Sequence, residues 1–219
     1  MKRLVSTLKN IWHIVDLRTR ILNTLLFLLI YRIGSYIVLP GVDPSHLKQS
    51  TQEGILGLLN MFAGGSFSRA SVFALGVMPY ISASIVIQLL TIAVPSFQKM
   101  QKEGESGRKQ INKITRILTV VITAAQAIGY LKTMVPANAV LVNSTLFTIS
   151  SVLILTSGTM FVMWLGEKIT DKGIGNGISI IIMVGIIARL PLSLVSELST
   201  RLNGAGGIIT FIIENVILL

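Results

Sequence analysis

Long apolar stretches alternate with short charged segments along most of the chain. They predict five membrane helices, near residues 21–39, 72–94, 114–131, 146–165 and 178–195. Each approaches the length of about 20 apolar residues that crosses a hydrocarbon core about 30 Å thick. A sixth stretch, 207–219, is still apolar at its last residue, so we expect it to begin a further helix of a longer protein. The pattern predicts an all-α fold, a polytopic bundle of transmembrane helices.

The apolar pattern is broken before the second predicted helix. A short run, GILGLLNMFA (54–63), is followed by Gly64 and Gly65, and the uncharged run resumes only after Arg69. Ten helical residues reach about 15 Å, roughly half of the hydrocarbon core. Irregular backbone at that depth is tolerated only where protein or water satisfies its polar groups. The break predicts a re-entrant half-helix that enters from the outer side and borders a cavity. The alternative is a helix that rests on the outer surface of the lipid.

Composition agrees with a membrane protein. Hydrophobic residues make up 52% of the 219 residues and charged residues only 13%, and the mean hydropathy is +0.75. A soluble domain carries about 25% charged residues. The net charge of +10 would suit nucleic acid, but the basic residues cluster between the apolar stretches, as membrane topology requires. The absence of cysteine from the sequence excludes disulfides and thiolate metal sites.

The basic residues also predict the orientation. Thirteen lie in segments that we expect to be cytoplasmic: Lys2, Arg3, Lys9, Arg18, Arg20, Lys99, Lys102, Arg108, Lys109, Lys113, Arg116, Lys168 and Lys172. Four lie on the opposite side: Lys48, Lys132, Arg189 and Arg201. The positive-inside rule therefore places the N-terminus in the cytoplasm. Residues 1–20 have apolar positions at helical spacing, which indicates an amphipathic helix on the membrane surface; a disordered basic tail is the alternative.

Several polar positions invite a functional interpretation. Arg32 lies within the first apolar stretch, and we favour a structural role, either snorkelling to the interface or pairing with a carbonyl. Ser66 or Ser68 is expected to cap the second membrane helix. GIGNGIS (173–179) lacks the spacing of a dinucleotide loop and indicates a glycine-rich turn that opens the fifth helix.

The second membrane helix combines an apolar face with a few polar residues. Val77 and Ile81 are four residues apart and share one face. Ser82, Ser84 and Gln88 are expected to find partners on a neighbouring helix or in water. The sequence has no paired intramembrane carboxylate and no nucleophile motif, so we expect no enzyme activity and no cofactor.

Four long strings resemble the SecY family, whose members are channel subunits of the bacterial Sec protein translocase. They are YRIGSYIVLPGV (31–42), NMFAGGSFSRASVFALGVMPYISASIVIQLL (60–90), QKEGESGRKQI (101–111) and GTMFVMWLGEKITDKGIGNGISIII (158–182). The strings occur in order along nearly the whole chain. The resemblance covers the N-terminal half of such a protein and implies that residues 21–195 form one half of a pseudo-symmetric channel.

The resemblance also implies roles for individual residues. The half-helix, about residues 55–67, corresponds to the plug that seals the pore, with the residues Ile55, Leu58, Leu59, Met61, Phe62, Gly64 and Gly65. Three aliphatic side chains correspond to the pore ring: Val77, Ile81 and Ile182. Ser84 and Gln88 correspond to contacts of a lateral gate. Six basic residues correspond to loops that meet cytoplasmic partners: Lys99, Lys102, Arg108, Lys109, Lys168 and Lys172.

The implied function is that of a passive conduit in the bacterial plasma (inner) membrane. It would carry unfolded secretory polypeptides across and release membrane proteins sideways into the lipid bilayer. The implied partners are the small membrane subunits SecE and SecG, the motor ATPase SecA, the ribosome, signal sequences and the remaining C-terminal half of the same protein. The rival functions are a secondary transporter, which needs ionisable groups within its spans, an intramembrane protease, and an insertase without a pore.

Overall fold

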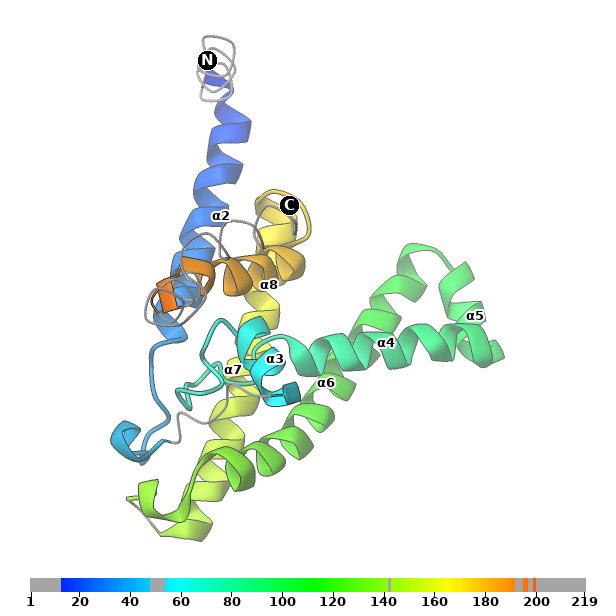
Figure 1. Ribbon diagram of the computed structural model, residues 1–219. Coiled ribbons are helices and arrows are strands. Elements are labelled where there is room, and N and C mark those ends of the chain that lie inside the picture. Colours follow the sequence, from blue (N-terminus) through cyan, green and yellow to red (C-terminus); the bar gives the residue numbers. More distant parts are fainter. Residues whose placement is uncertain (1–12, 48–53, 142, 192–194, 197–198, 200–219) are drawn as a thin grey trace.

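The computed structural model describes residues 13–47, 54–141, 143–191, 195–196 and 199 (Figure 1). The elements in chain order are α2 (Val15–Gly34), η1 (Pro44–His46), α3 (Gly54–Phe62), α4 (Met78–Ala93), α5 (Pro95–Lys102), α6 (Glu105–Met134), η2 (Ala137–Ala139), α7 (Ser144–Lys172) and α8 (Gly177–Ile187). Within this part of the chain the only β contacts are two isolated bridges, which confirms the all-α prediction. The predicted sixth helix, 207–219, and most of the predicted surface segment, 1–20, lie outside the described residues.

The helices form two lobes that share α6 and α7. Helix α7 contacts α2, α6 and α8, and Figure 1 shows α2 and α7 in the larger lobe. Helix α4 packs along α6, and α5 joins the far ends of this pair in the second lobe. By length and composition, α6 and α7 are each able to cross a membrane, and the bent pair α4–α5 is a third candidate. Each of the five predicted membrane helices corresponds to a helix of the structure, with shifted bounds.

The first predicted helix is displaced toward the N-terminus. Helix α2 begins at Val15 and ends at Gly34, whereas the sequence predicted residues 21–39. Residues 15–20 therefore form its first turns and not part of a separate surface helix. The chain leaves the helix because residues 37–39 pair with the segment that precedes α4: Leu39 N–H donates to Ala70 O at 2.8 Å, and Val72 N–H donates to Ile37 O at 2.9 Å.

The second predicted helix is shorter than expected. Helix α4 begins at Met78 and not at residue 72, and residues 63–77 form an irregular segment. This makes the capping prediction wrong, because the Ser66 hydroxyl donates to Ala63 O and Phe73 O within the segment. At its other end α4 stops at Ala93, where Pro95 forces the preceding residue into an extended conformation and α5 turns away by 98°.

Helices α7 and α8 begin close to the predicted residues, but α7 continues to Lys172 and not only to residue 165, and α8 ends at Ile187 and not at residue 195. The Asn143 side chain caps α7 by accepting a hydrogen bond from Thr145 N–H at 3.3 Å. Asn176 caps α8 by accepting from Ile178 N–H at 3.1 Å and Ser179 N–H at 3.2 Å. Residues 173–176 are thus the predicted glycine-rich turn. Close approach of the two helices here depends on Gly166 and Gly177, because a Cβ on Gly177 would collide with Gly166 O.

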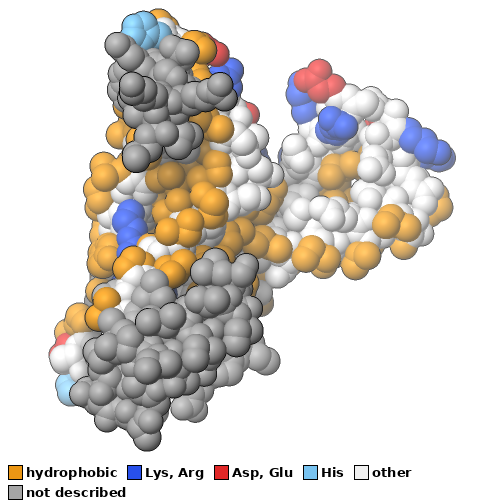
Figure 2. All heavy atoms as spheres, turned by 45° about the horizontal axis from the view of Figure 1, so that its top comes forward, with side chains coloured by type: hydrophobic (Ala, Val, Ile, Leu, Met, Phe, Trp, Pro, Cys, Tyr) orange, Lys and Arg blue, Asp and Glu red, His pale blue; other side chains and the backbone are white. Residues whose placement is uncertain are grey.

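The surface of the molecule agrees with a lipid environment. Large aliphatic side chains are exposed along α2 and α4, among them Leu29, Leu89 and Ile92. Figure 2 shows hydrophobic side chains over much of the visible face of the larger lobe, while Lys and Arg gather on the lobe that carries α5. Charged side chains therefore concentrate at helix ends, and the sides of the helices are apolar.

Candidate functional site

The short helix α3 lies at the centre of the molecule. It has nine residues, which corresponds to about 14 Å, and it packs against α8. The Asn60 side chain is 3% exposed and faces the protein, whereas those of Leu58, Met61 and Phe62 are exposed. A helix that packs against a second helix in this way supports the re-entrant prediction over a helix lying on the lipid. The Ile55 side chain lies outside the described residues, although its backbone belongs to α3.

Glycines allow α3 to approach α8 closely. The chain turns after Phe62 through Gly64 (φ +60°) and Gly65 (φ +85°), a conformation that other residues rarely adopt. A Cβ on Gly64 would lie 3.1 Å from Gly185 Cα, and a Cβ on Gly185 would lie 2.9 Å from Phe62 O. The predicted turn at Gly64 and Gly65 is therefore present, and it rests directly on the backbone of α8.

Two arginines bind the carbonyl group at this turn. Arg32 Nη1 and Arg69 Nη2 each donate to Gly64 O at 3.3 Å. Arg32 Nη2 also donates to the Tyr36 hydroxyl at 3.0 Å, and both guanidinium groups lie over the Tyr36 ring. Pairing of Arg32 with a carbonyl is thus confirmed. The C-terminal end of a helix carries partial negative charge, so these cations stabilise the end of α3.

The protein supplies hydrogen-bond partners to much of the backbone of the irregular segment 63–77. Besides the bonds to residues 37–39, the Tyr130 hydroxyl of α6 donates to Phe67 O at 2.6 Å, and the rings of Phe67 and Tyr130 meet edge to face. Asn60 Oδ1 accepts from Ser68 N–H at 3.1 Å. Non-helical backbone at membrane depth requires such partners. The segment is therefore a fixed part of the fold that sets where α4 begins.

The three predicted ring residues come together in one apolar cluster. Val77 is 5% exposed, and Ile81 and Ile182 are half-buried against the same group of side chains. Ile81 N–H donates to Val77 O at 3.1 Å, so the two side chains lie one turn apart on α4. Aliphatic groups offer no hydrogen bonds. A chain passing such a surface would meet contacts that do not depend on its sequence.

The stacked aromatic side chains of Tyr31, Phe73 and Phe161 back this cluster. The ring centroids of Tyr31 and Phe73 are 6.2 Å apart, and those of Phe73 and Phe161 are 5.8 Å apart. Phe73 fits there because Gly34 of α2 has no side chain: a Cβ at that position would collide with the Phe73 ring. The apolar cluster is thus packed against aromatic side chains of α2 and α7.

The predicted gate residues contact each other. Gln88 Nε2 donates to Ser84 Oγ at 3.3 Å, and Ser82 Oγ donates to Met78 O at 3.2 Å within the same helix. The sequence predicted partners on a neighbouring helix or in water, but the partners found among the described residues belong to α4 itself. The exposed side chains beside them, such as Ile85 and Leu89, leave this face of α4 open.

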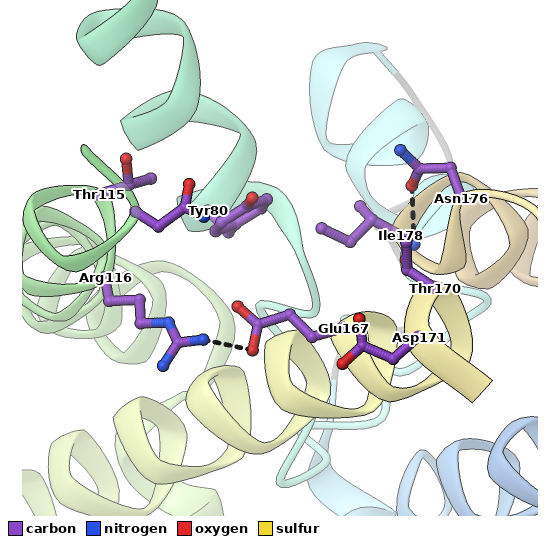
Figure 3. Close-up of a pocket in the computed structure, with 9 residues that line it drawn as sticks. Tyr80, Thr115, Arg116, Glu167, Thr170, Asp171, Asn176 and Ile178 are labelled. Carbon is purple, nitrogen blue, oxygen red and sulfur yellow. Dashed lines mark hydrogen bonds and ion pairs between the residues drawn. The ribbon is translucent and has the colours of Figure 1, made fainter. Parts of the chain in front are cut away.

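A polar pocket of about 220 Å³ lies beside the apolar cluster, between α4, α6, α7 and the start of α8 (Figure 3). Its walls are formed by Tyr80, Asn112, Thr115, Arg116, Glu167, Thr170, Asp171, Asn176 and Ile178. Arg116 Nη2 and Glu167 Oε2 form an ion pair at 2.6 Å that joins α6 to α7. Tyr80 is one residue from Ile81, so the wall of α4 changes from polar to apolar within one turn.

The six basic residues predicted to lie in loops lie on helices. Lys99 and Lys102 belong to the last turn of α5, Arg108 and Lys109 lie in the first turns of α6, and Lys168 and Lys172 end α7. Lys109 pairs with Glu105 at 3.0 Å, and Lys168 Nζ lies 5.9 Å from the centroid of the Trp164 ring. Helix α6 extends beyond its apolar stretch at the N-terminal end, where Glu105 and Lys109, opposite charges four residues apart, stabilise exposed helix.

Sequence reasoning missed several residues that position α3. Arg69, Tyr130, Asn60 and Gly185 hold the turn and the irregular segment, yet none was assigned a role. Arg69 carried a usable signal, an arginine within an otherwise apolar region. Tyr130 and Gly185 act through contacts distant in sequence, so no local pattern marks them. Asn60 accepts from Ser68 across an irregular turn that the sequence does not specify. Within the described part of the chain, no group of three or more His, Asp or Glu side chains is placed to hold a metal ion.

Known proteins resemble this chain in sequence. The SecY family model matches residues 71–219. The chain is 44% identical over 220 residues to the protein translocase subunit SecY of Buchnera aphidicola subsp. Schizaphis graminum, covering 97% of this chain and 50% of that protein. It is 49% identical over 183 residues to the protein translocase subunit SecY of Escherichia coli K12, covering 80% of this chain and 41% of that protein. The chain thus spans about half the length of the curated relatives it matches.

Solved structures share the fold. The structure described as Sec61 in the canine ribosome–channel complex from the endoplasmic reticulum matches with a TM-score of 0.58 and 16% identity, covering 92% of this chain and 42% of that chain. A structure described as a protein conducting channel matches with the same TM-score and identity, covering 41% of that chain. Two lines of comparison, sequence and fold, lead to one conclusion: the chain belongs to the SecY family.

Proposed function

We propose that the chain is the N-terminal half of the pore-forming subunit of a protein translocase, a passive conduit for unfolded polypeptides. The observation that carries the proposal is the contact of α3 with α8 at Gly185, three residues from Ile182, which packs in the same cluster as Val77 and Ile81. A short helix in this place is suited to obstruct a pore. An apolar constriction excludes ions by dewetting while it remains closed.

The same proposal assigns α4 to one side of a lateral gate. Its exposed face carries Ser84, Gln88 and large aliphatic side chains, which suits contact with the apolar helix of a signal sequence. The second wall of the gate and the rest of the ring would come from the C-terminal half. We propose that the small membrane subunits SecE and SecG stabilise the two halves.

The basic ends of α5, α6 and α7 are proposed to face the cytoplasm of a bacterial cell, with the N-terminus on the same side of the inner membrane. Lys99, Lys102, Arg108 and Lys109 stand at the tip of the lobe that α5 completes, where an acidic partner surface would be attracted. We propose SecA and the ribosome as these partners. They would supply the energy, so the chain itself needs no catalytic group.

Crosslinking tests the conduit directly, because the native sequence has no cysteine. Single cysteines at Val77, Ile81 and Ile182 in the full-length protein should each crosslink to a secretory precursor stalled during translocation. A cysteine at Val121, which is 61% exposed on α6, is the matched control and should not react with the precursor. Crosslinks from the control position alone, or from none of the four, would refute the proposed path.

A further inference from the structure

Three arginines converge at the turn after α3. Arg32 and Arg69 share Gly64 O, and Arg189, which follows α8, lies against Gly65: a Cβ on Gly65 would be 2.8 Å from Arg189 Nε and 3.0 Å from its Cζ. Each of the three guanidinium groups interacts electrostatically with the other two. They come from three separate segments of the chain, so the fold itself assembles this arginine cluster.

The arginine cluster has charge that its neighbours do not neutralise. The ion pairs among the described residues join Arg20 to Asp16, Lys109 to Glu105 and Arg116 to Glu167, and none involves the cluster. The groups that the cluster does contact are the neutral oxygens of Gly64, Ser35 and Tyr36. Three like charges in a half-buried place repel one another, and a bound anion would remove that repulsion.

The arginine cluster also has unused hydrogen-bond donors. Arg69 Nε is buried and donates to no partner, and Arg189 donates to no oxygen of the described residues. The Tyr36 ring covers one face of Arg32 and of Arg69, and the remaining N–H groups lie in the planes of the guanidinium groups, clear of the ring. A planar fork of N–H donors matches the oxygens of a phosphate, which arginine binds with two parallel hydrogen bonds.

From this convergence of charge and free donors we infer that Arg32, Arg69 and Arg189 form a binding site for a phosphate-type anion beside the turn of α3. The chemistry fits the phosphate of an anionic lipid headgroup and free inorganic phosphate equally. Gly65 keeps the site open, because a side chain there would occupy the position of Arg189. The anion would bridge α2, the segment before α4 and the end of α8, and would hold the turn of α3 between them.

The test measures binding to the full-length protein in a neutral detergent by isothermal titration calorimetry. The probes are inorganic phosphate, short-chain phosphatidylglycerol and, as a lipid without net charge, short-chain phosphatidylcholine. We expect saturable binding of an anionic probe to the wild type. The Kd should rise about tenfold or more in Arg189→Gln, because this variant loses a pair of charge-assisted hydrogen bonds. Arg189→Lys should recover part of the affinity. Lys132→Gln, which removes an exposed charge at the end of α6, is the control and should bind as the wild type does.

The arms of the test separate the two sources of phosphate. Binding of phosphatidylglycerol without inorganic phosphate assigns the site to a lipid headgroup, and the reverse assigns it to the free anion. Failure of both to bind, or equal affinity in wild type and Arg189→Gln, would overturn the inference. Arg69→Gln supplies a second variant, because Arg69 Nε is the buried donor. The measurement involves no translocation, so it stands independently of the proposed conduit.

Discussion

Gly64 and Gly185 place the backbones of α3 and α8 in direct contact. A Cβ on Gly64 would lie 3.1 Å from Gly185 Cα, and one on Gly185 would lie 2.9 Å from Phe62 O. Contacts this close leave no room for even one added methyl group without movement of backbone. The position of the short helix is therefore defined by two residues that have no side chains.

The first prediction concerns this contact. Gly185→Ala should displace α3 and raise the ion conductance of the resting channel in planar bilayers, because overpacking of this kind costs about 1–3 kcal/mol. Gly129→Ala is the matched control, since a Cβ on Gly129 of α6 meets nothing within 4 Å. Conductance of Gly185→Ala equal to that of the control would show that α3 does not close the pore.

The sequence pattern was sufficient to predict the helical membrane fold and the break at Gly64 and Gly65. Apolar stretches and glycine act locally, so a single sequence reveals them. The helix bounds were less accurate. Residues 72–77 are apolar and read as helix, yet they are irregular because Val72 N–H pairs with Ile37 O and Gly76 adopts a φ of +53°.

The candidate site also combines features that the sequence predicted with features that it did not. The three aliphatic residues predicted for the ring do share one cluster, although their role in a pore is a proposal. The sequence predicted that Arg32 could pair with a carbonyl but not which one, and it indicated no partner for Tyr130: Tyr130 and Phe67 are 63 positions apart, and Arg32 and Gly64 are 32 apart. Partners so distant in sequence are set by the packing of helices, and no local pattern records them.

The second prediction tests the support of the irregular segment. Tyr130→Phe removes the short hydrogen bond to Phe67 O and leaves this carbonyl with the longer bond from Ala70 N–H at 3.4 Å, while the edge-to-face ring contact remains. Loss of such a bond costs about 0.5–1.5 kcal/mol, so the Tm of the purified protein should fall. Tyr80→Phe is the control. It also removes a tyrosine hydroxyl, but this hydroxyl bonds to no described residue, so the Tm should stay near that of the wild type. Equal Tm changes in the two variants would argue against a specific role for Tyr130.

The third prediction places a charge in the apolar cluster. Ile81→Asp should make the resting channel conduct ions, because a hydrated carboxylate prevents dewetting of the constriction. It should also change which signal sequences are accepted in a secretion assay. Ile81→Leu keeps the volume and the apolar character and serves as the control. A tight seal in correctly inserted Ile81→Asp would count against the ring assignment.

The fourth prediction concerns the start of α8. Helix α3 rests near the other end of α8, at Gly185. Asn176 Oδ1 accepts from the amides of Ile178 and Ser179, so Asn176→Ala should destabilise this end of the helix by about 1 kcal/mol. Hydrogen–deuterium exchange of the peptide that covers residues 174–182 should become faster, while exchange in α6 stays the same. Asn176→Asp keeps an oxygen acceptor and adds negative charge at the helix N-terminus, so its exchange should match the wild type. If Asn176→Asp exchanges as fast as Asn176→Ala, the amide group of Asn176 has a role other than capping, and the turn at residues 173–176 depends on a different contact.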